Sequence, residues 1–209
     1  MVIFPFSIGN LTKLTSLVLG RNELTGPIPS WLANLTQLNT LWLPCNKLCG
    51  PIPASISSLL NLQILDLYSN NLSGTIEFDL FRKLNNLSIL DLSNNNLSLV
   101  IDPSTNFTFQ KFKVNAFPWR SLQILFLSNN KLQGALPIPP PSIFYYSVSN
   151  NTLTGDISQM ICEISSLSYL DVSHNNLSGF LPHCLGDLRN LSILNLITTT
   201  FMAAFLKYS

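Results

Sequence analysis

The sequence predicts a repeat solenoid of the α/β type, with one short parallel strand in every coil. A skeleton of the form LxxLxLxxNxLxGxLP recurs along the chain and is cleanest in residues 165–182. Its first position falls at spacings of 24, 24, 25, 35, 21, 24 and 24, at Leu14, Leu38, Leu62, Leu87, Leu122, Ile143, Leu167 and Leu191. A fixed period of this length is the signature of stacked repeats, because each unit can bury its apolar face only against its neighbours.

The skeleton is that of a leucine-rich repeat array, and it divides the chain into five parts. Residues 1–10 are a partial repeat, residues 11–97 hold repeats 1–4, and residues 122–196 hold repeats 5–8. Residues 98–121 have neither the LxL spacing nor a repeat asparagine, so we expect an irregular insert or deletion junction, and a bulge or kink there. Residues 197–209 form a tail without the repeat, in which Thr199 stands where an asparagine is due.

The LxL segment of each repeat alternates with period two, as a half-buried strand does. In the third copy Leu65 and Leu67 should face the core, while Ile64, Asp66 and Tyr68 face solvent. An asparagine follows the second core residue by three positions, at a turn that leaves backbone groups without sheet partners. Its amide can both donate to and accept from those groups. We expect a structural ladder of Asn22, Asn46, Asn70, Asn95, Asn130, Asn151 and Asn175.

The GxIP element follows the repeat asparagine and precedes the convex segment, as in residues 26–29 and 50–53. Glycine allows a tight backbone, and proline removes a donor where no ladder partner is available. The segments that follow, such as SWLANL, are short and weakly helical. They should form 3-10, helical or irregular pieces on the convex side.

Composition excludes two classes of partner. Only 10% of the 209 residues are charged and the net charge is +1, too little basic surface to follow nucleic-acid phosphates. The apolar residues are spread at repeat spacing and never run for the roughly 18 positions of a transmembrane helix. The amino end, MVIFPFSIGN, lacks the basic region of a secretory signal, and both solenoid ends look open.

Two long stretches resemble consecutive signatures of the Cf-type receptor-like proteins of plants, whose ectodomains are leucine-rich repeats. These are GTIEFDLFRKLNNLSILDLSNNNLSLVIDPSTNFTFQKFKV and KLQGALPIPPPSIFYYSVSNNTLTGDISQMICEISSLSYLDVSHNNLSGFLPHCLGDL. The GxIP subtype is similar to the plant-specific class, which implies a right-handed superhelix with the strands on its concave face. In the family several more repeats separate a KFKV-like stretch from a KLQG-like one, so repeats look missing near residues 114–117.

The resemblance implies an extracellular or plasma-membrane-associated recognition module in defence or developmental signalling. It would bind a peptide, protein or glycan and act with a co-receptor kinase. One alternative is a secreted protein resembling polygalacturonase inhibitors, which share the GxIP repeat but carry cysteine caps that this chain lacks. Another is a non-functional truncated remnant.

The expected binding surface is the concave face, where the repeat leaves the residue type free. Large aromatic side chains on a face that packs against nothing internal are typical binding anchors, although single exposed aromatics are ordinary. The candidates are Arg21, Trp42, Tyr68, Phe126, Tyr145, Tyr169 and His174.

Nine NxS/T sequences predict N-glycosylation in a secretory compartment, although the repeat wording NLT and NLS also generates them. They stand at Asn10, Asn34, Asn71, Asn86, Asn96, Asn106, Asn150, Asn176 and Asn190.

No catalytic residues, metal site or cofactor is predicted. Asp171, Ser173 and His174 are residue types of a hydrolytic triad, but an open sheet face offers no oxyanion hole. His174, His183, Cys162 and Cys184 are zinc-ligand types on different sides of the coil. For Cys162 and Cys184 a disulfide between adjacent convex segments and two free buried cysteines both remain open, and no bond is expected between Cys45 and Cys49.

Overall fold

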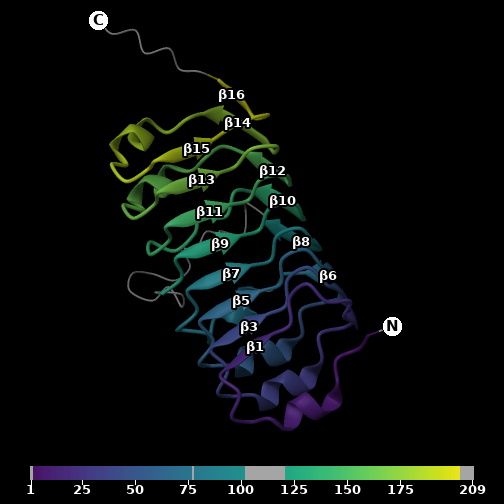
Figure 1. Ribbon diagram of the computed structural model, residues 1–209. Coiled ribbons are helices and arrows are strands. Elements are labelled where there is room, and N and C mark those ends of the chain that lie inside the picture. The colour runs from purple at the N-terminus through teal and green to yellow at the C-terminus, as the bar shows by residue number, and fades with distance from the viewer. Residues whose placement is uncertain (1, 77, 102–120, 203–209) are drawn as a thin grey trace, which may run out of the picture.

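A computed structural model describes residues 2–76, 78–101 and 121–202, which form a solenoid with a parallel sheet along each of two sides (Figure 1). The first sheet has the order β1-β3-β5-β7-β9-β11-β13-β15. Its strands are β1 (Ser16–Val18), β3 (Thr40–Trp42), β5 (Ile64–Asp66), β7 (Ile89–Asp91), β9 (Ile124–Phe126), β11 (Tyr145–Ser147), β13 (Tyr169–Asp171) and β15 (Ile193–Asn195). Each is the predicted LxL segment of one repeat.

The second sheet was not predicted, because the sequence indicated only one strand in each coil. It has the order β16-β14-β12-β10-β8-β6-β4-β2 and follows the repeat asparagines. Its strands are β2 (Thr25–Gly26), β4 (Lys47–Gly50), β6 (Asn71–Thr75), β8 (Asn96–Ile101), β10 (Lys131–Ala135), β12 (Thr152–Gly155), β14 (Asn176–Phe180) and β16 (Thr200–Met202). A glycine with φ near +85° ends or interrupts most of these strands, for example Gly26, Gly155 and Gly179.

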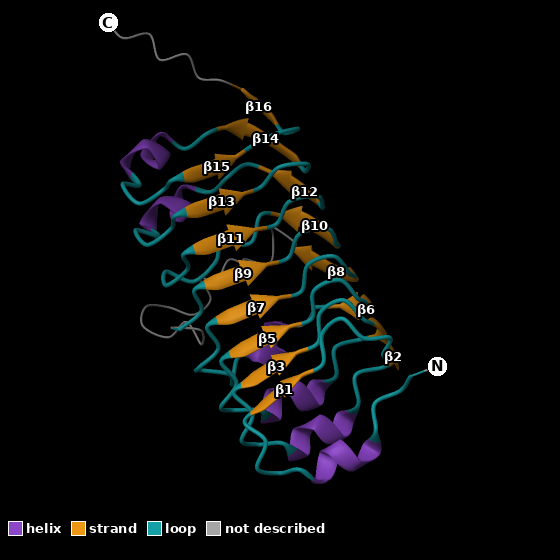
Figure 2. Cartoon of the chain, viewed as in Figure 1, coloured by secondary structure: helices purple, strands orange, loops and turns teal. Residues whose placement is uncertain are grey.

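Short 3-10 helices join the end of the second sheet to the next strand of the first (purple in Figure 2). They are η1 (Phe6–Asn10), η2 (Ser30–Asn34), η3 (Ala54–Ser58), η4 (Phe78–Phe81), η7 (Gln159–Glu163) and η8 (His183–Asp187). Proline precedes four of them, at Pro5, Pro29, Pro53 and Pro182. At η7 the repeat proline is replaced by Ser158, whose hydroxyl accepts a hydrogen bond from the Met160 N–H.

One apolar core runs through the solenoid and consists of the leucine and isoleucine positions of the repeat. Tyr146 takes the place of one of these leucines and is fully buried. The segment beside it, residues 136–140, has no regular secondary structure, and the Tyr146 hydroxyl donates to the Pro137 carbonyl at 2.7 Å. A proline-rich connection therefore leaves room for a phenol and supplies its acceptor.

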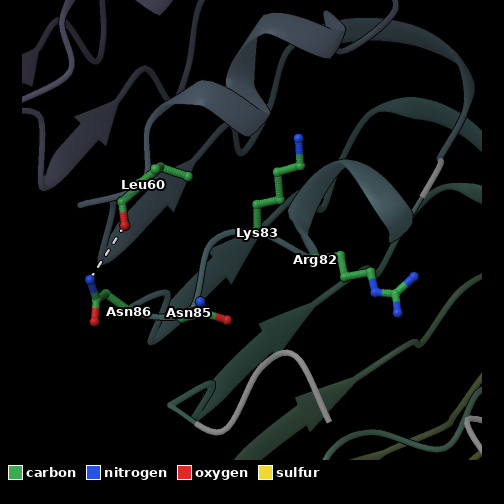
Figure 3. Close-up of a pocket in the computed structure, with 5 residues that line it drawn as sticks. All are labelled: Leu60, Arg82, Lys83, Asn85 and Asn86. Carbon is green, nitrogen blue, oxygen red and sulfur yellow. Dashed lines mark hydrogen bonds between the residues drawn. The ribbon is translucent and has the colours of Figure 1, made fainter. Parts of the chain in front are cut away.

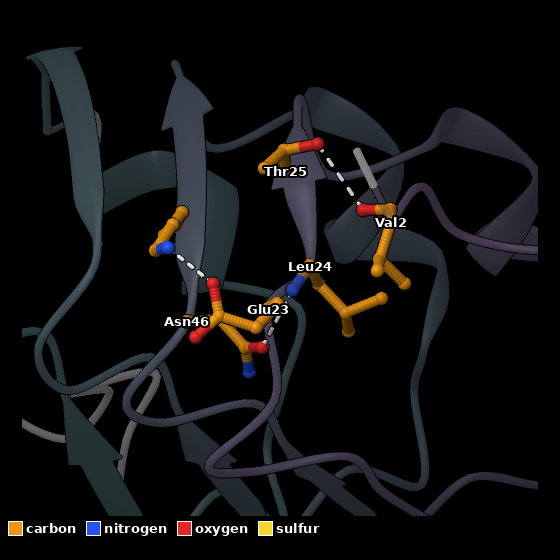
Figure 4. Close-up of polar contacts among 6 residues, drawn as sticks. Val2, Glu23, Leu24, Thr25 and Asn46 are labelled. Carbon is orange, nitrogen blue, oxygen red and sulfur yellow. Dashed lines mark hydrogen bonds and ion pairs between the residues drawn. The ribbon is translucent and has the colours of Figure 1, made fainter.

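The asparagines connect successive coils. Asn46 Oδ1 accepts from the Leu24 N–H at 3.1 Å (Figure 4). The Asn46 Nδ2 donates to the carbonyls of Leu19 and Leu43 at 2.9 and 3.1 Å. Asn70, Asn95, Asn130, Asn151 and Asn175 repeat this arrangement. Asn22 has no preceding repeat asparagine and donates only to Leu19 and Gly20 of its own coil.

Strand β8 extends into the range that the sequence predicted for the insert. Residues 98–101 are strand, and Ser98 to Ile101 pair with Lys131 to Gly134 of β10. In the first sheet β7 pairs directly with β9, with Asp91 opposite Phe126. Hydrogen bonds between backbones do not depend on the repeat sequence. The strand pairing of both sheets therefore continues past the insert, without the interruption that the expected kink would cause. The rest of the insert, residues 102–120, lies outside the described residues.

The tail boundary is corrected in the same way. Thr200 to Met202 form β16 and pair with Ser178 to Phe180 of β14. The Thr199 hydroxyl donates to the Leu196 carbonyl at 2.6 Å, which is one of the bonds that a repeat asparagine makes. Residues 197–202 thus continue the coil although they lack its sequence. Across residues 2–76, 78–101 and 121–202, no helix has the length and apolarity that a membrane crossing requires.

Candidate recognition surface

The solvent-facing side of the first sheet, which we call the concave face, carries the sequence-predicted aromatic residues. Strands are paired in register, so residues at equivalent repeat positions form rows across the sheet, about 4.8 Å apart. Trp42, Asp66, Asp91 and Phe126 belong to one such row. Thr40, Ile64, Ile89 and Ile124 belong to the row beside it.

Four of the five aromatic candidates form two groups rather than one. Tyr145 and Tyr169 lie on β11 and β13 with ring centroids 5.7 Å apart. Phe144, which the sequence analysis missed, packs edge-on against Tyr145 at 4.8 Å and is 42% exposed. Trp42 and Tyr68 are 43% and 40% exposed in the amino-terminal half, and Phe126 is half-buried between the groups. Phe144 directly precedes strand β11, so the sequence analysis would have included it if the residue before each strand had been considered.

Arg21 and His174 lie at the rim of the concave face. Both residues directly precede a repeat asparagine, and their φ values of 55° and 51° place them in the left-handed region. Cys45, Ser69 and Asn150 occupy the same repeat position in other coils, also with positive φ. The two side chains are therefore exposed at a turn and are far apart along the solenoid, in the first and seventh repeats.

Three aspartates point onto the concave face and accept hydrogen bonds from their own chain. Asp66 Oδ1 accepts from the Tyr68 N–H at 2.9 Å, and Asp91 Oδ1 accepts from the Ser93 N–H at 2.9 Å. Burial raises the pKa of Asp66 to about 6, an effect to which the neighbouring Asp91 adds. Burial also raises the pKa of Asp91.

Asp171 is buried and accepts from Ser173, from both the backbone N–H and the hydroxyl. The Ser173 hydroxyl is thus directed to Asp171 rather than to His174, so these residues have no triad geometry. The Tyr169 hydroxyl donates to Asp171 at 3.3 Å. Burial, with a smaller contribution from Asp171, raises the pKa of Tyr169. Within the described residues, no group of three or more His, Cys, Asp and Glu side chains could hold a metal ion.

Cys45 lies at the rim of the concave face, and the other three cysteines lie away from this face. Cys162 of η7 and Cys184 of η8 form a disulfide between the convex segments of adjacent coils, with Cα atoms 5.8 Å apart. Cys45 and Cys49 are free thiols.

Except for Asn150, the described sequons lie on surfaces other than the concave face. Asn71, Asn96 and Asn176 open strands of the second sheet, and Asn10 and Asn34 end the 3-10 helices η1 and η2. Asn86 and Asn190 stand in turns and donate to carbonyls of the preceding coil, while Asn150 lies at the rim. All eight side chains are exposed, and none belongs to a strand of the first sheet. Asn106 is outside the described residues.

A depression of about 630 Å³ on another face is a weaker candidate (Figure 3). Leu60, Arg82, Lys83, Asn85 and Asn86 line it. Asn86 is the acceptor of a sequon, and its amide donates to the Leu60 carbonyl at 3.3 Å. An N-glycan on Asn86 would cover this depression, which favours the concave face as the recognition surface.

The model of the Leucine Rich Repeat family matches residues 13–35, 61–84, 86–107, 121–144 and 166–188, together more than half of the chain. Receptor-like protein 7 of Arabidopsis thaliana is 46% identical over 54 residues, which are 26% of this chain and 6% of that protein. Receptor-like protein 41 of Arabidopsis thaliana is 51% identical over 45 residues, which are 22% of this chain and 5% of that protein. The chain is homologous to plant receptor-like proteins and matches only a small part of their length.

Solved plant structures share the fold over 95% of this chain. A plant ice-binding protein has a TM-score of 0.79 with 31% identity and is itself covered to 60%. A TDR receptor has a TM-score of 0.78 with 31% identity and is covered to 37%. The Arabidopsis receptor kinase HAESA, in complex with the peptide hormone IDA and the co-receptor SERK1, has a TM-score of 0.70 with 28% identity and is covered to 36%.

Proposed function

Because the chain belongs to the leucine-rich repeat family, we propose that it is an extracellular recognition module whose concave face binds a peptide or protein ligand. In a complete receptor-like protein, the bound ligand or the module itself would engage a co-receptor kinase at the plasma membrane. The single observation that carries the proposal is the set of aromatic side chains on the solvent-facing side of the first sheet.

The aromatic groups support ligand binding energetically. Trp42, Tyr68 and Tyr145 are each more than a third exposed, while the repeat leucines of the same strands are fully or nearly fully buried. Aromatic side chains give large contact areas at low entropic cost and dominate interface energies. A partner that covers them would gain burial without disturbing the core.

The distribution of sequons supports the same face. The eight described sequon asparagines lie on the second sheet, at 3-10 helix ends, in turns or at the rim. Glycans at these positions would keep large partners away from those surfaces and leave the strands of the first sheet accessible. The similarity to HAESA, whose structure contains a peptide hormone and a co-receptor, supports a ligand of this class.

The proposal is tested by selecting binders from a random peptide library displayed on phage against the secreted chain. Binders should lose at least about tenfold in affinity for a Trp42→Ala/Tyr68→Ala/Tyr169→Ala variant. The matched control replaces Phe6, Leu60 and Phe180 by alanine, because these exposed apolar residues lie off the concave face. Equal losses in both variants, or losses in the control alone, would contradict a concave-face site.

A further inference from the structure

Four adjacent strands present an aromatic, two carboxylates and an aromatic in a single line on the concave face. Trp42 of β3 is in register with Asp66 of β5, Asp66 with Asp91 of β7, and Asp91 with Phe126 of β9. We call these four residues the acidic row. Strand spacing of about 4.8 Å places each side chain beside the next.

Within the described residues, neither carboxylate of the acidic row is paired with a cation. Each uses its Oδ1 atom for donors of its own chain: Asp66 accepts from the Tyr68 N–H, and Asp91 accepts from both the N–H and the hydroxyl of Ser93. In the part of the chain that the structure describes, the one ion pair joins Lys47 and Glu23, which flank strands of the second sheet. Two like charges thus stand next to each other on a half-buried surface, with neither neutralised.

This placement is costly until a cation arrives. Burial penalises the charged form of a carboxylate, and a neighbouring carboxylate adds to that penalty. Both effects act on Asp66, whose pKa is raised, and burial acts likewise on Asp91. Along the rest of this row the described strands of the first sheet carry Val18, Ser147, Asp171 and Asn195, so two acids stand on adjacent strands at β5 and β7.

We infer that the acidic row is the binding site for one arginine side chain of the peptide or protein ligand. A guanidinium is planar and carries five donors, so one group can contact two carboxylates on adjacent strands. Trp42 and Phe126, at the two ends of the row, offer ring faces that attract a cation. This inference rests on the proposed function, because it names the ligand group that the concave face takes.

The neighbouring rows suit the rest of an arginine side chain. Ile64 and Ile89 lie two positions before the aspartates on the same face and give an apolar surface for the methylene stem. Tyr68 lies two positions after Asp66, with its ring 40% exposed. A lysine ammonium is a compact, strongly hydrated charge and would use the two carboxylates less well.

The experiment titrates the folded, disulfide-bonded chain with N-acetyl-arginine amide and follows the Trp42 indole N–H signal by nuclear magnetic resonance. The Trp31 indole is the internal reference, since Trp31 packs against Phe4 at 5.9 Å and away from the concave face. N-acetyl-citrulline amide serves as the uncharged isostere. N-acetyl-lysine amide and spermidine serve as other cations.

A saturable shift of the Trp42 signal is expected with the arginine probe, and citrulline should bind about tenfold more weakly or worse. An Asp66→Asn/Asp91→Asn variant should lose this preference while it keeps the amide oxygens that Tyr68 and Ser93 require. Asp187→Asn removes a charge from the exposed convex side and should keep the preference. Chemical-shift dispersion of the variants shows that they remain folded.

Equal shifts with arginine and citrulline, or a preference that survives Asp66→Asn/Asp91→Asn, would overturn the inference. Spermidine that binds as well as arginine would assign the row to a polyamine instead, which also overturns it. The proposed function is judged separately, by the selected peptides. Peptides whose binding requires Trp42 and Tyr169 but that contain no arginine would support the proposed function. They would overturn only the inference that the acidic row binds arginine.

Discussion

At the scale of single residues, the side chains that build the coil are distinct from those available for binding. Asn151 is buried, and its Nδ2 donates to the carbonyls of Leu127 and Val148 at 3.1 and 2.9 Å while its Oδ1 accepts from Leu132. Tyr169 and Trp42, a few positions away in the repeat, make no contribution of this kind. Stability and recognition can therefore be changed independently.

Replacing Asn151 by alanine should lower the free energy of unfolding by about 2–4 kcal/mol, because several buried backbone groups lose their partner. Asn22→Ala is the matched control and should cost under about 1 kcal/mol, since Asn22 is exposed and bonds only within its own coil. Urea denaturation followed by circular dichroism measures both. Similar losses in the two variants would show that the bonds between coils add little.

The raised pKa of Asp66 predicts a pH dependence of stability. Between its ordinary value of 3.8 and the folded-state value of about 6, the folded chain holds a proton that the unfolded chain has released. The free energy of unfolding should therefore fall as the pH rises through this window. Asp66→Asn should show a smaller fall than the wild type in urea titrations at pH 4 and pH 6. An unchanged fall would mean that Asp66 does not carry the effect.

At the scale of elements, the first sheet could be predicted because its signal is a periodic apolar pattern. The second sheet could not be predicted, because residues such as Ser73 and Gly74 of β6 do not alternate between apolar and polar types. They pair with β8 through backbone hydrogen bonds. The same reason explains β16, which pairs without the repeat wording, and Ser98 to Ile101 of β8. Backbone hydrogen bonding propagates from a neighbouring strand, and a single sequence does not record it.

The convex side of the last coils depends on the disulfide between η7 and η8. Cys162 and Cys184 are separated by 22 positions, and closing a loop of this length restricts the unfolded chain by about 3 kcal/mol. Reducing agent should therefore lower the urea midpoint of the wild type, and Cys162→Ser/Cys184→Ser should be equally low without it. Cys45→Ser/Cys49→Ser should respond to reductant as the wild type does. A wild type that is insensitive to reductant would contradict this role.

At the scale of the whole molecule, the sequence predicted the array and the face on which aromatic side chains gather. It placed Trp42, Tyr68, Tyr145 and Tyr169 on one face because the period fixes side-chain direction. It did not predict the split into two aromatic groups or the contact of Phe144 with Tyr145, since these depend on rotamers and on register across coils. The line from Trp42 to Phe126 likewise became visible only when β7 and β9 were found paired across the insert.

A glycan placed on the concave face should block recognition. Tyr145→Asn creates an Asn-Tyr-Ser acceptor together with Tyr146 and Ser147, in the middle of the first sheet. Peptides selected on the wild type should bind the glycosylated variant at least about tenfold more weakly than Tyr145→Gln, which lacks the acceptor. Biolayer interferometry before and after glycan removal measures this. Equal binding by both variants would place the peptide site elsewhere.

Hydroxyl-radical footprinting of the glycosylated chain, with and without the tightest selected peptide, tests the concave-face site most directly. The method reports the solvent access of each side chain. We predict that the peptide protects Trp42, Tyr68, Tyr145 and Tyr169 and leaves Phe6 and Phe180 as reactive as before. Protection of Phe6, Phe180 or the depression around Leu60, with the four concave-face aromatics unchanged, would contradict the assignment of recognition to the first sheet.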